Sequence, residues 1–160
     1  MTDLTAEEAR NIWGYNPETG DLTWEITKNR QLKGSKAGIV SIYGYLTVHY
    51  KKRYRKNRLV WLIVTGSWPV GQIDHINGDR TDDRFSNLRE CSQNQNMWNR
   101  RVHKNNKLGI KGVHKNGNGY IAYIMQFRHR IYLGYFKTVN EAKNAYDEAA
   151  KKFHGEFARF

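Results

Sequence analysis

The sequence has few of the residues that stabilise small secreted proteins or span membranes. Its 160 residues include one cysteine, which excludes an intrachain disulfide and a four-cysteine structural zinc site. Proline occurs twice, and no Ser/Pro-rich or repetitive tract predicts a long flexible linker. The longest apolar run, at 59–64, is far too short to cross a bilayer. No apolar segment follows the acidic N-terminus, so we expect no secretory signal and a reducing, cytoplasmic setting.

Acidic residues are also scarce, and their scarcity grows along the chain. The formal net charge is +12. Residues 1–50 carry five basic and six acidic side chains, residues 51–100 carry ten and five, and residues 101–160 carry twelve and four. A rising positive charge is expected where later segments follow phosphate groups, although a merely soluble basic surface would look the same.

What is present is enough apolar surface for packed cores, at 39% hydrophobic and 13% aromatic residues. A capping box at Thr5 and Glu8 predicts a helix at 6–12. The turn at 16–20 predicts a hairpin between 13–15 and 22–24, and strands are expected within 38–50. Residues 58–64 read as a short helix that ends near Gly66. The basic run at 51–56 is either a solvated hairpin tip or a strand edge that contacts phosphate, the latter through Lys52, Arg53 and Arg55.

The most informative segment lies between residues 73 and 98. Asp74 and His75 end a predicted strand, a turn follows at 77–79, and a second strand is predicted at 85–89. A capping box at 92–95 then predicts a helix that carries Asn96 in its first turns. The expected order is therefore strand, turn, strand and helix.

These residue types suit the hydrolysis of a phosphodiester bond. A neutral His75 can accept the proton of the attacking water. Asp74 can hold a divalent ion, and Asn96 can complete the protein's share of its coordination through the amide oxygen. Asn87 is expected to hydrogen-bond the loop that carries His75. Few protein ligands suit one Mg²⁺ or Mn²⁺ ion. Adjacent strand residues point to opposite faces, so a shared pocket requires the strand to bend at its end.

The order and spacing of these residues resemble the HNH family of homing and phage-type endonucleases. The resemblance covers most of residues 10–100 and includes the segments 58–61 and 66–69. It implies a ββα-metal fold, with His75 as general base, Asp74 and Asn96 on the metal, and Asn87 supporting the base. Two positions depart from it, because Asn57 stands where histidine is common and Asp83 where asparagine is common.

The segment after residue 108 has a different pattern. Val113, the turn at 116–119 and the runs 120–127 and 130–136 predict three short strands. A capping box at Thr138 and Glu141 opens an amphipathic helix that reaches Gly155. The predicted module is a three-stranded antiparallel sheet with one helix on one face and the other face open.

Residues 109–160 resemble the APETALA/ethylene-response-factor DNA-binding domain, notably at 131–136 and 145–150. The resemblance implies a sheet that enters the major groove of DNA. Tyr123 can point either way. The candidate contacts are Lys111, His114, Lys115, Tyr120, Tyr123, Arg128 and Arg130.

We therefore expect an α+β protein with a nuclease domain at 1–100, a basic linker at 101–108 and a DNA-binding domain at 109–160. The linker would neutralise phosphates through Arg100, Arg101, Lys104 and Lys107. The predicted function is that of a site-recognising, metal-dependent endonuclease of homing or mobile-element type. We expect it to be a monomer that binds double-stranded DNA and does not associate with membranes. The alternatives are a DNA-binding protein that has lost cleavage and an RNA-directed nuclease, the latter disfavoured by the narrow major groove of A-form RNA.

Overall fold

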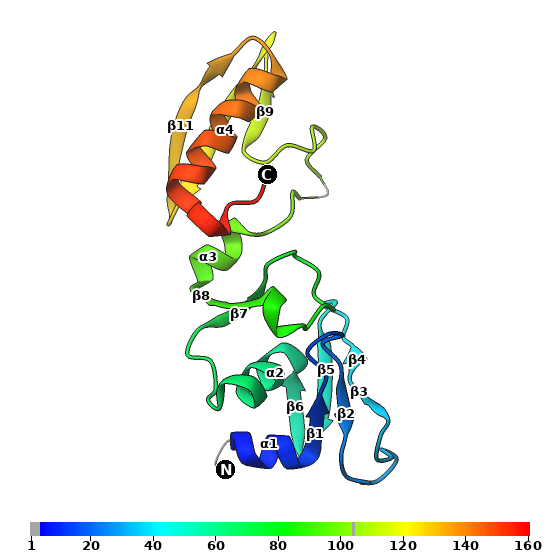
Figure 1. Cartoon of the computed structure of the whole chain (residues 1–160). Coiled ribbons are helices and arrows are strands. Elements are labelled where there is room, and N and C mark those ends of the chain that lie inside the picture. The colour runs from blue at the N-terminus through cyan, green and yellow to red at the C-terminus, as the bar shows by residue number, and fades with distance from the viewer. Residues whose placement is uncertain (1–3, 104) are drawn as a thin grey trace. The chain divides into compact units, whose positions relative to one another are not determined.

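The computed structural model describes residues 4–103 and 105–160, and they form two compact units that divide between Ser92 and Gln93. Figure 1 shows the order of the elements along the chain. Within the described residues, no helix combines the length and apolar character that a membrane crossing needs. The units begin and end elsewhere than the domains predicted from the sequence, since the first one stops before the helix that carries Asn96.

The first unit starts with a helix and a hairpin, as the sequence predicts. Helix α1 (Ala6–Ile12) begins at the Thr5–Glu8 capping box, in which each side chain bonds the other residue's backbone N–H. Strand β1 (Trp13–Tyr15) pairs with β2 (Leu22–Trp24), which also pairs with β3 (Lys36–Ala37).

A second sheet and a buried helix follow in this unit. Strands β4 (Ile39–Val40), β5 (Leu46–Tyr50) and β6 (Lys52–Arg55) form an antiparallel sheet. Helix α2 (Lys56–Thr65) ends where Gly66 adopts a left-handed φ of 84°, which glycine tolerates best. The basic run at 51–56 is therefore a strand that leads into a helix.

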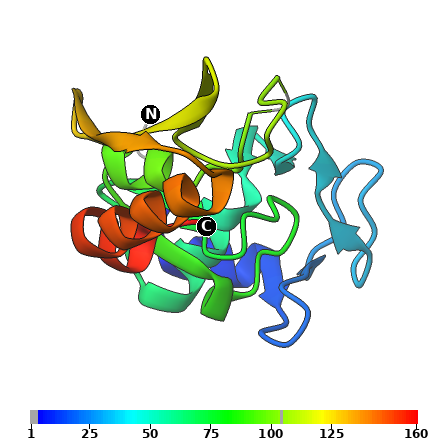
Figure 2. The same cartoon turned by 90° about the horizontal axis from the view of Figure 1, so that it is seen from above.

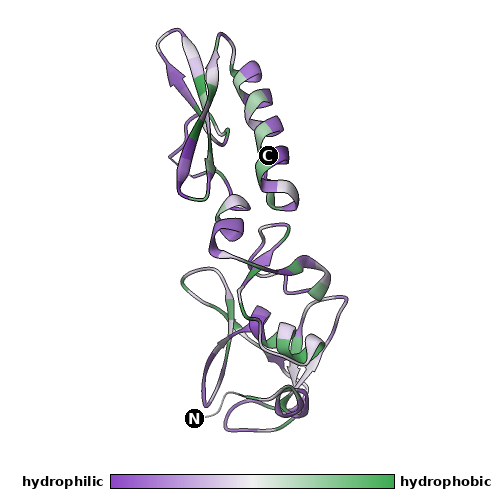
Figure 3. Cartoon of the chain, turned by 90° about the vertical axis from the view of Figure 1, so that its left-hand side faces the viewer, coloured by the Kyte–Doolittle hydropathy of each residue, from purple (hydrophilic) through white to green (hydrophobic). Residues whose placement is uncertain are grey.

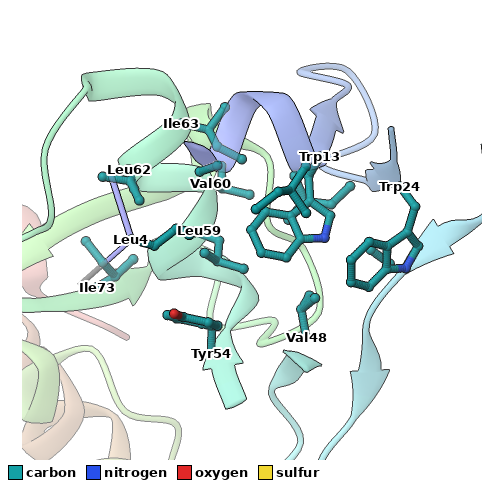
Figure 4. Close-up of a cluster of buried hydrophobic side chains, with 14 of the residues drawn as sticks. Leu4, Trp13, Trp24, Val48, Tyr54, Leu59, Val60, Leu62, Ile63 and Ile73 are labelled. Atoms are coloured by element: carbon teal, nitrogen blue, oxygen red, sulfur yellow. The ribbon is translucent and has the colours of Figure 1, made fainter. Parts of the chain in front are cut away.

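The hydrophobic core of the first unit lies between these elements and α1. Figure 4 shows Trp13, Trp24, Val48 and the apolar side of α2 gathered around it. Trp13 is almost fully buried at 1% exposure, and its ring centroid lies 5.5 Å from that of Trp24. Burying side chains of this size contributes about 1.5 to 3 kcal/mol each, so this core fixes the frame on which the candidate site stands.

The site region consists of a short hairpin with a helical turn inside it. Strand β7 (Gln72–His75) pairs antiparallel with β8 (Leu88–Cys91). The strand predicted at 85–89 is shorter than expected, because a 3₁₀ turn, η1 (Phe85–Asn87), precedes β8. The Trp61 ring of α2 packs 5.3 Å from the Phe85 ring, which explains why the chain turns there instead of extending.

The second unit contains the predicted sheet and helix. Strands β9 (Val113–Asn116), β10 (Gly119–Gln126) and β11 (His129–Phe136) lie in the order β11-β10-β9. Helix α4 (Val139–His154) runs along one face of this sheet (Figure 2), and hydrophobic residues recur along it (Figure 3). Its buried side chains include Ala142, Tyr146 and Ala150. A 3₁₀ turn, η2 (Gly155–Phe157), follows.

Helix α3 (Gln93–Trp98) also belongs to the second unit. The Trp98 ring stacks on His154 with centroids 4.4 Å apart and an interplanar angle of 10°, and it meets the edge of Phe127 at 5.9 Å. The Nε2 atom of His154 lies 2.8 Å from the Met125 carbonyl oxygen. These contacts explain why the unit starts at Gln93 and not after residue 100.

Candidate active site and nucleic-acid interface

Asp74 and His75 are both buried at the end of strand β7, at 6% and 3% exposure. Asp74 pairs across the hairpin with Arg89, whose Nε and Nη2 atoms donate to Asp74 Oδ2 at 3.0 and 2.9 Å. This pair places a positive charge against the carboxylate. An ionised carboxylate accepts several bonds on its two oxygens, so the arginine is compatible with a metal ion at the same group.

His75 bonds a second carboxylate, which the sequence analysis did not assign to the site. Its Nε2 atom lies 2.8 Å from Asp83 Oδ1, and Asp83 is 1% exposed. The Lys56 ammonium lies 3.9 Å from Asp83 Oδ2 and 3.8 Å from Asp21 Oδ1. These groups thus form a chain from the half-buried carboxylate of Asp21 through the Lys56 ammonium and the Asp83 carboxylate to the His75 imidazole.

The environment shifts the ionisation of both new members. Burial raises the pKa of the Asp83 carboxyl, and the hydrogen bond with His75 and the charges of His75 and Lys56 oppose that rise. Burial also lowers the pKa of Lys56, while the negative charges of Asp83 and Asp21 oppose the fall. Each charge makes burial of the other tolerable, because an unpaired buried charge is strongly destabilising.

The N-terminal hairpin holds the backbone that carries Asp83. Tyr15 Oη accepts a hydrogen bond from the Phe85 backbone N–H at 2.7 Å and lies 3.5 Å from the Asp83 carbonyl oxygen. Gly20 has a φ of +74°, and a Cβ atom there would overlap the backbone of Asp83 and Arg84. The hairpin predicted at 13–24 therefore positions the site as well as filling the core.

Asn87 organises the turn after His75, which is the position predicted for it. Its Oδ1 atom accepts from the Asn77 backbone N–H at 3.0 Å. Its Nδ2 atom donates to Asn77 Oδ1 at 3.1 Å and to the Asp82 carbonyl at 2.8 Å. Three bonds from one side chain close the turn, while the part of this side chain in catalysis stays a prediction.

Asn96 lies in α3, in the second unit, and its side chain is half-buried. Its pairing with Asp74 on one metal ion stays a prediction from the sequence pattern. Among the described residues, no three His, Cys, Asp or Glu side chains gather as a metal site. The hard oxygen donors of Asp74 and Asn96 fit Mg²⁺ or Mn²⁺, which keep several waters.

The basic strand β6 presents its side chains on two faces. Arg53 and Arg55 pair with His49 and Thr47, so they share the outer face of the sheet. The Arg55 guanidinium lies 4.8 Å from the centroid of the Tyr45 ring, and that ring lies 6.1 Å from the ring of His75. Arg55 is therefore close to the candidate base. Lys52, the third predicted contact in this strand, lies on the opposite face, 5.3 Å above the Tyr54 ring.

The open face of the C-terminal sheet differs in part from the one predicted. Tyr120 pairs with Phe136, and its half-buried side chain packs against the core beside α4, so its contact with DNA stays a prediction. Lys115 pairs with Tyr120 and so projects from the same side of the sheet, although it is exposed. The alternation of strand residues then places Tyr123 on the open face.

Aromatic and basic side chains gather on that open face. The Tyr123 ring lies 5.4 Å from Tyr132 and 6.4 Å from His114, and the Arg130 guanidinium lies 5.1 Å above it. A bulge beside Gly134 shifts the register, so Tyr132 and Tyr135 are both exposed despite their odd spacing. Arg128 is exposed in the turn between β10 and β11.

The residues predicted to contact phosphate in and next to the linker differ in their exposure. Arg100, Arg101 and Lys107 are exposed, and Lys104 lies outside the described residues. Lys111 is half-buried and donates to the carbonyl oxygens of Trp98 and Arg100, the latter at 3.0 Å. Burial and the charges of Arg159 and Arg100 lower its pKa to about 8. Lys111 therefore holds the end of α3, and its contact with phosphate stays a prediction.

The segment that contains these residues is similar to known proteins. Residues 54–98 match the family model described as HNH endonuclease. The match includes Asp74, His75, Asp83, Asn87 and Asn96. A 68-residue stretch of the chain is 38% identical to Protein 3.8 of Escherichia phage T7, covering 40% of this chain and 56% of that protein. The chain thus spans just over half of this relative. No solved structure matches significantly.

Asp83 and Lys56 are part of the site in the structure but are not among the site residues predicted from the sequence. Asp83 stood out only as a carboxylate where the HNH resemblance leads one to expect an amide. Lys56 was counted in a basic run, and nothing local distinguishes a lysine that folds inward from one in solvent. The one available signal was that Lys56 precedes an apolar helix, where its stem can be buried.

Proposed function

We propose that this protein is a divalent-metal-dependent endonuclease that hydrolyses phosphodiester bonds of double-stranded DNA. The family match at 54–98 supports a nuclease. The observation that carries the proposal further is the buried hydrogen bond of 2.8 Å between His75 and Asp83, beside a second buried carboxylate on Asp74. A buried imidazole held by a carboxylate is suited to accept a proton from water.

In the proposed mechanism, the Asp83 carboxylate accepts a hydrogen bond from the Nε2–H group of His75. A neutral imidazole has one N–H group and one lone pair, so the lone pair then lies on Nδ1. His75 would accept the proton of the attacking water at Nδ1. Asn87 keeps the following turn closed, so that the ring remains oriented while it gains and loses that proton.

Asp74 and Asn96 would hold the metal ion in this mechanism. A bound Mg²⁺ or Mn²⁺ ion would supply positive charge to the phosphate and its leaving oxygen. Arg89 balances the charge of Asp74 and orients its carboxylate through two donors on one oxygen.

The test is nicking of supercoiled plasmid by the full chain in Mg²⁺ or Mn²⁺, with EDTA and His75→Ala as controls. We expect cleavage that requires the metal and is lost in the variant, while affinity for DNA stays within about twofold. DNA binding without cleavage under all these conditions would contradict the proposal and favour a binding protein.

We also propose that the open face of the C-terminal sheet reads DNA. The exposed Tyr132 and Tyr135 beside His114, Tyr123 and Arg130 combine rings with positive charge, as surfaces that bind nucleic acid often do. The test compares sequenced cleavage ends of wild type and Arg130→Gln in a genomic DNA pool. Ends that keep the same sequence preference in the variant would contradict this reader.

A further inference from the structure

Strands β4 and β5 form a ribbon in the first unit (Figure 1). Four large apolar side chains near its end are exposed. Ile39 and Val40 are 70% and 62% exposed, and Ile42 and Tyr43 are 92% and 70% exposed. Burial of such side chains is favourable by about 1.5 to 3 kcal/mol each, so their exposure within five residues needs a reason. We call residues 39–43 the ribbon tip.

The ribbon tip has a defined conformation. Ile39 pairs with Thr47 and Val40 pairs with Leu46, so these two apolar side chains emerge on opposite faces. The Ser41 N–H donates to the Tyr45 carbonyl and the Gly44 N–H donates to the Ser41 carbonyl, both at 2.8 Å. The ribbon tip therefore exposes apolar side chains on both of its faces. Such an element is suited to contact a partner on two sides.

The ribbon tip is fastened to the candidate active site. Arg80, from the turn after His75, donates through Nη1 to the Tyr43 carbonyl at 2.8 Å. The guanidinium groups of Arg80 and Arg55 lie 4.7 and 4.8 Å from the centroid of the Tyr45 ring. That ring is 6.1 Å from the ring of His75. A partner held by the tip would thus also lie beside the general base.

The charge around the tip indicates what this partner is. The chain has no Asp or Glu between residues 26 and 73, and ten Lys or Arg residues lie within 26–58. A stretch without carboxylates that surrounds exposed apolar groups suits a polyanion with apolar surfaces inside its grooves. Base pairs meet this description, and apolar wedges at base steps are a known way to bend a duplex.

We propose that the ribbon tip is a wedge that enters a groove of duplex DNA beside the scissile phosphate, with Ile42 and Tyr43 against the base pairs. This inference rests on the proposed DNA substrate. Arg55 and Arg80 would contact the flanking phosphates, so the tip would add local deformation of the duplex to the charge-led binding of the rest of the surface.

The test measures binding to a short fluorescein-labelled duplex of mixed sequence, in the full chain with His75→Ala to prevent cleavage. The double variant Ile42→Ser/Tyr43→Ser should bind about tenfold more weakly, since stacking on a base is worth about 1–3 kcal/mol. The matched control is Val70→Ser, because Val70 is an apolar residue that is 100% exposed outside the tip. It should bind as the parent does.

The salt dependence of DNA binding distinguishes insertion of the ribbon tip from charge-led contacts with phosphate. The tip variant should keep the parent's slope of log K against log[salt], whereas Arg55→Gln should reduce the slope by about one. Duplexes with 2-aminopurine at successive positions should become more fluorescent with the parent and not with the tip variant, because unstacking relieves quenching.

Unchanged affinity in the tip variant, or a fall in its salt slope, would overturn the wedge. So would sedimentation showing that the parent is a dimer and that the tip variant only dissociates it, since the tip would then bind a second copy. Absence of cleavage by the wild-type chain, with the binding results as expected, would count against the proposed function and leave the wedge standing.

Discussion

Replacing Asp83 by asparagine changes the charge of the side chain and nearly preserves its shape. One carboxylate oxygen becomes an NH2 group, which only donates. The Lys56 ammonium, 3.9 Å from Oδ2, also only donates, so it should draw the amide oxygen toward itself. The amide nitrogen would then face Nε2 of His75. Nε2 would have to accept, and the ring proton would move to Nδ1.

The distances give the size of this effect. At an effective dielectric constant of about 20, two unit charges at this separation attract by about 4 kcal/mol. An amide oxygen carries only a partial charge, so its attraction to the Lys56 ammonium is weaker. A quarter of that energy, about 1 kcal/mol, favours the orientation with the amide oxygen toward Lys56 about fivefold. A ring protonated on Nδ1 has lost its base there. A fivefold preference would leave about a sixth of the rings in the Nε2–H form, so the rate should fall at least about sixfold. The fall should approach the 10²- to 10⁴-fold that a general base contributes, or about 3 to 5 kcal/mol of transition-state stabilisation, as the preference becomes complete.

The assay is plasmid nicking under steady-state conditions, with the His75 tautomer read from long-range ¹H–¹⁵N spectra of the histidine-labelled full chain. Asp83→Asn should lower kcat and leave KM within about twofold, and its spectrum should show Nδ1–H. Asp82→Asn is the matched control, because Asp82 bonds Arg84 and Asn77 in the same loop.

Removing the lysine should reverse the effect. In Lys56→Met/Asp83→Asn the amide is free to turn its oxygen toward His75, so the Nε2–H form and most of the activity should return. An Asp83→Asn protein that keeps the Nε2–H form and full activity would refute the reasoning. A folded double variant that shows no recovery would refute the part assigned to Lys56.

Four further predictions concern stability and domain structure. Asn87→Ala removes three hydrogen bonds and should lower the free energy of unfolding in urea by about 2 kcal/mol; a loss below about 0.5 kcal/mol would contradict the assignment. Tyr15→Phe should cost about 1 kcal/mol in the same assay, because the Phe85 N–H loses its acceptor. Lys111 is neutral above about pH 8 in the folded chain and above about pH 10.5 when unfolded, so the unfolded state binds more protons between them. The wild type should therefore gain stability over Lys111→Met as pH rises through that window, and a flat difference would exclude the shift. A fragment of residues 1–92 should unfold cooperatively, whereas one of residues 1–100 should bind a hydrophobic dye through Trp98; equal dye binding would contradict the unit boundary.

Helices and hairpins that are marked by a few neighbouring residues could be predicted from the sequence. The capping boxes at Thr5 and Thr138 place the starts of α1 and α4, and the turn at 16–20 places the first hairpin. Each of these signals needs only neighbours within a few residues. The open side of the sheet could not be predicted with the same accuracy, because a bulge beside Gly134 in β11 breaks the simple alternation of that strand.

The candidate site was predicted in its motif but not in its supporting contacts. Asp74 and His75 end a strand as predicted, whereas Asn87 lies in a 3₁₀ turn and not in the strand predicted at 85–89. The bond between His75 and Asp83 depends on a loop that Tyr15 holds from the far end of the sequence. The burial of Lys56 depends on two carboxylates, one of them in the first hairpin. Contacts between distant segments leave no periodic trace in a single sequence.

The stacking of Trp98 on His154 has a consequence for anyone who recombines this protein with others. A chimera joined after residue 100 would transplant α3 without the imidazole and the Phe127 ring that cover its indole. A junction placed just before Gln93 would carry the helix and its cover together. Exchange of the second unit, whether by a protein engineer or by natural recombination, should therefore yield folded proteins more often at Ser92 than in the basic stretch that follows Trp98.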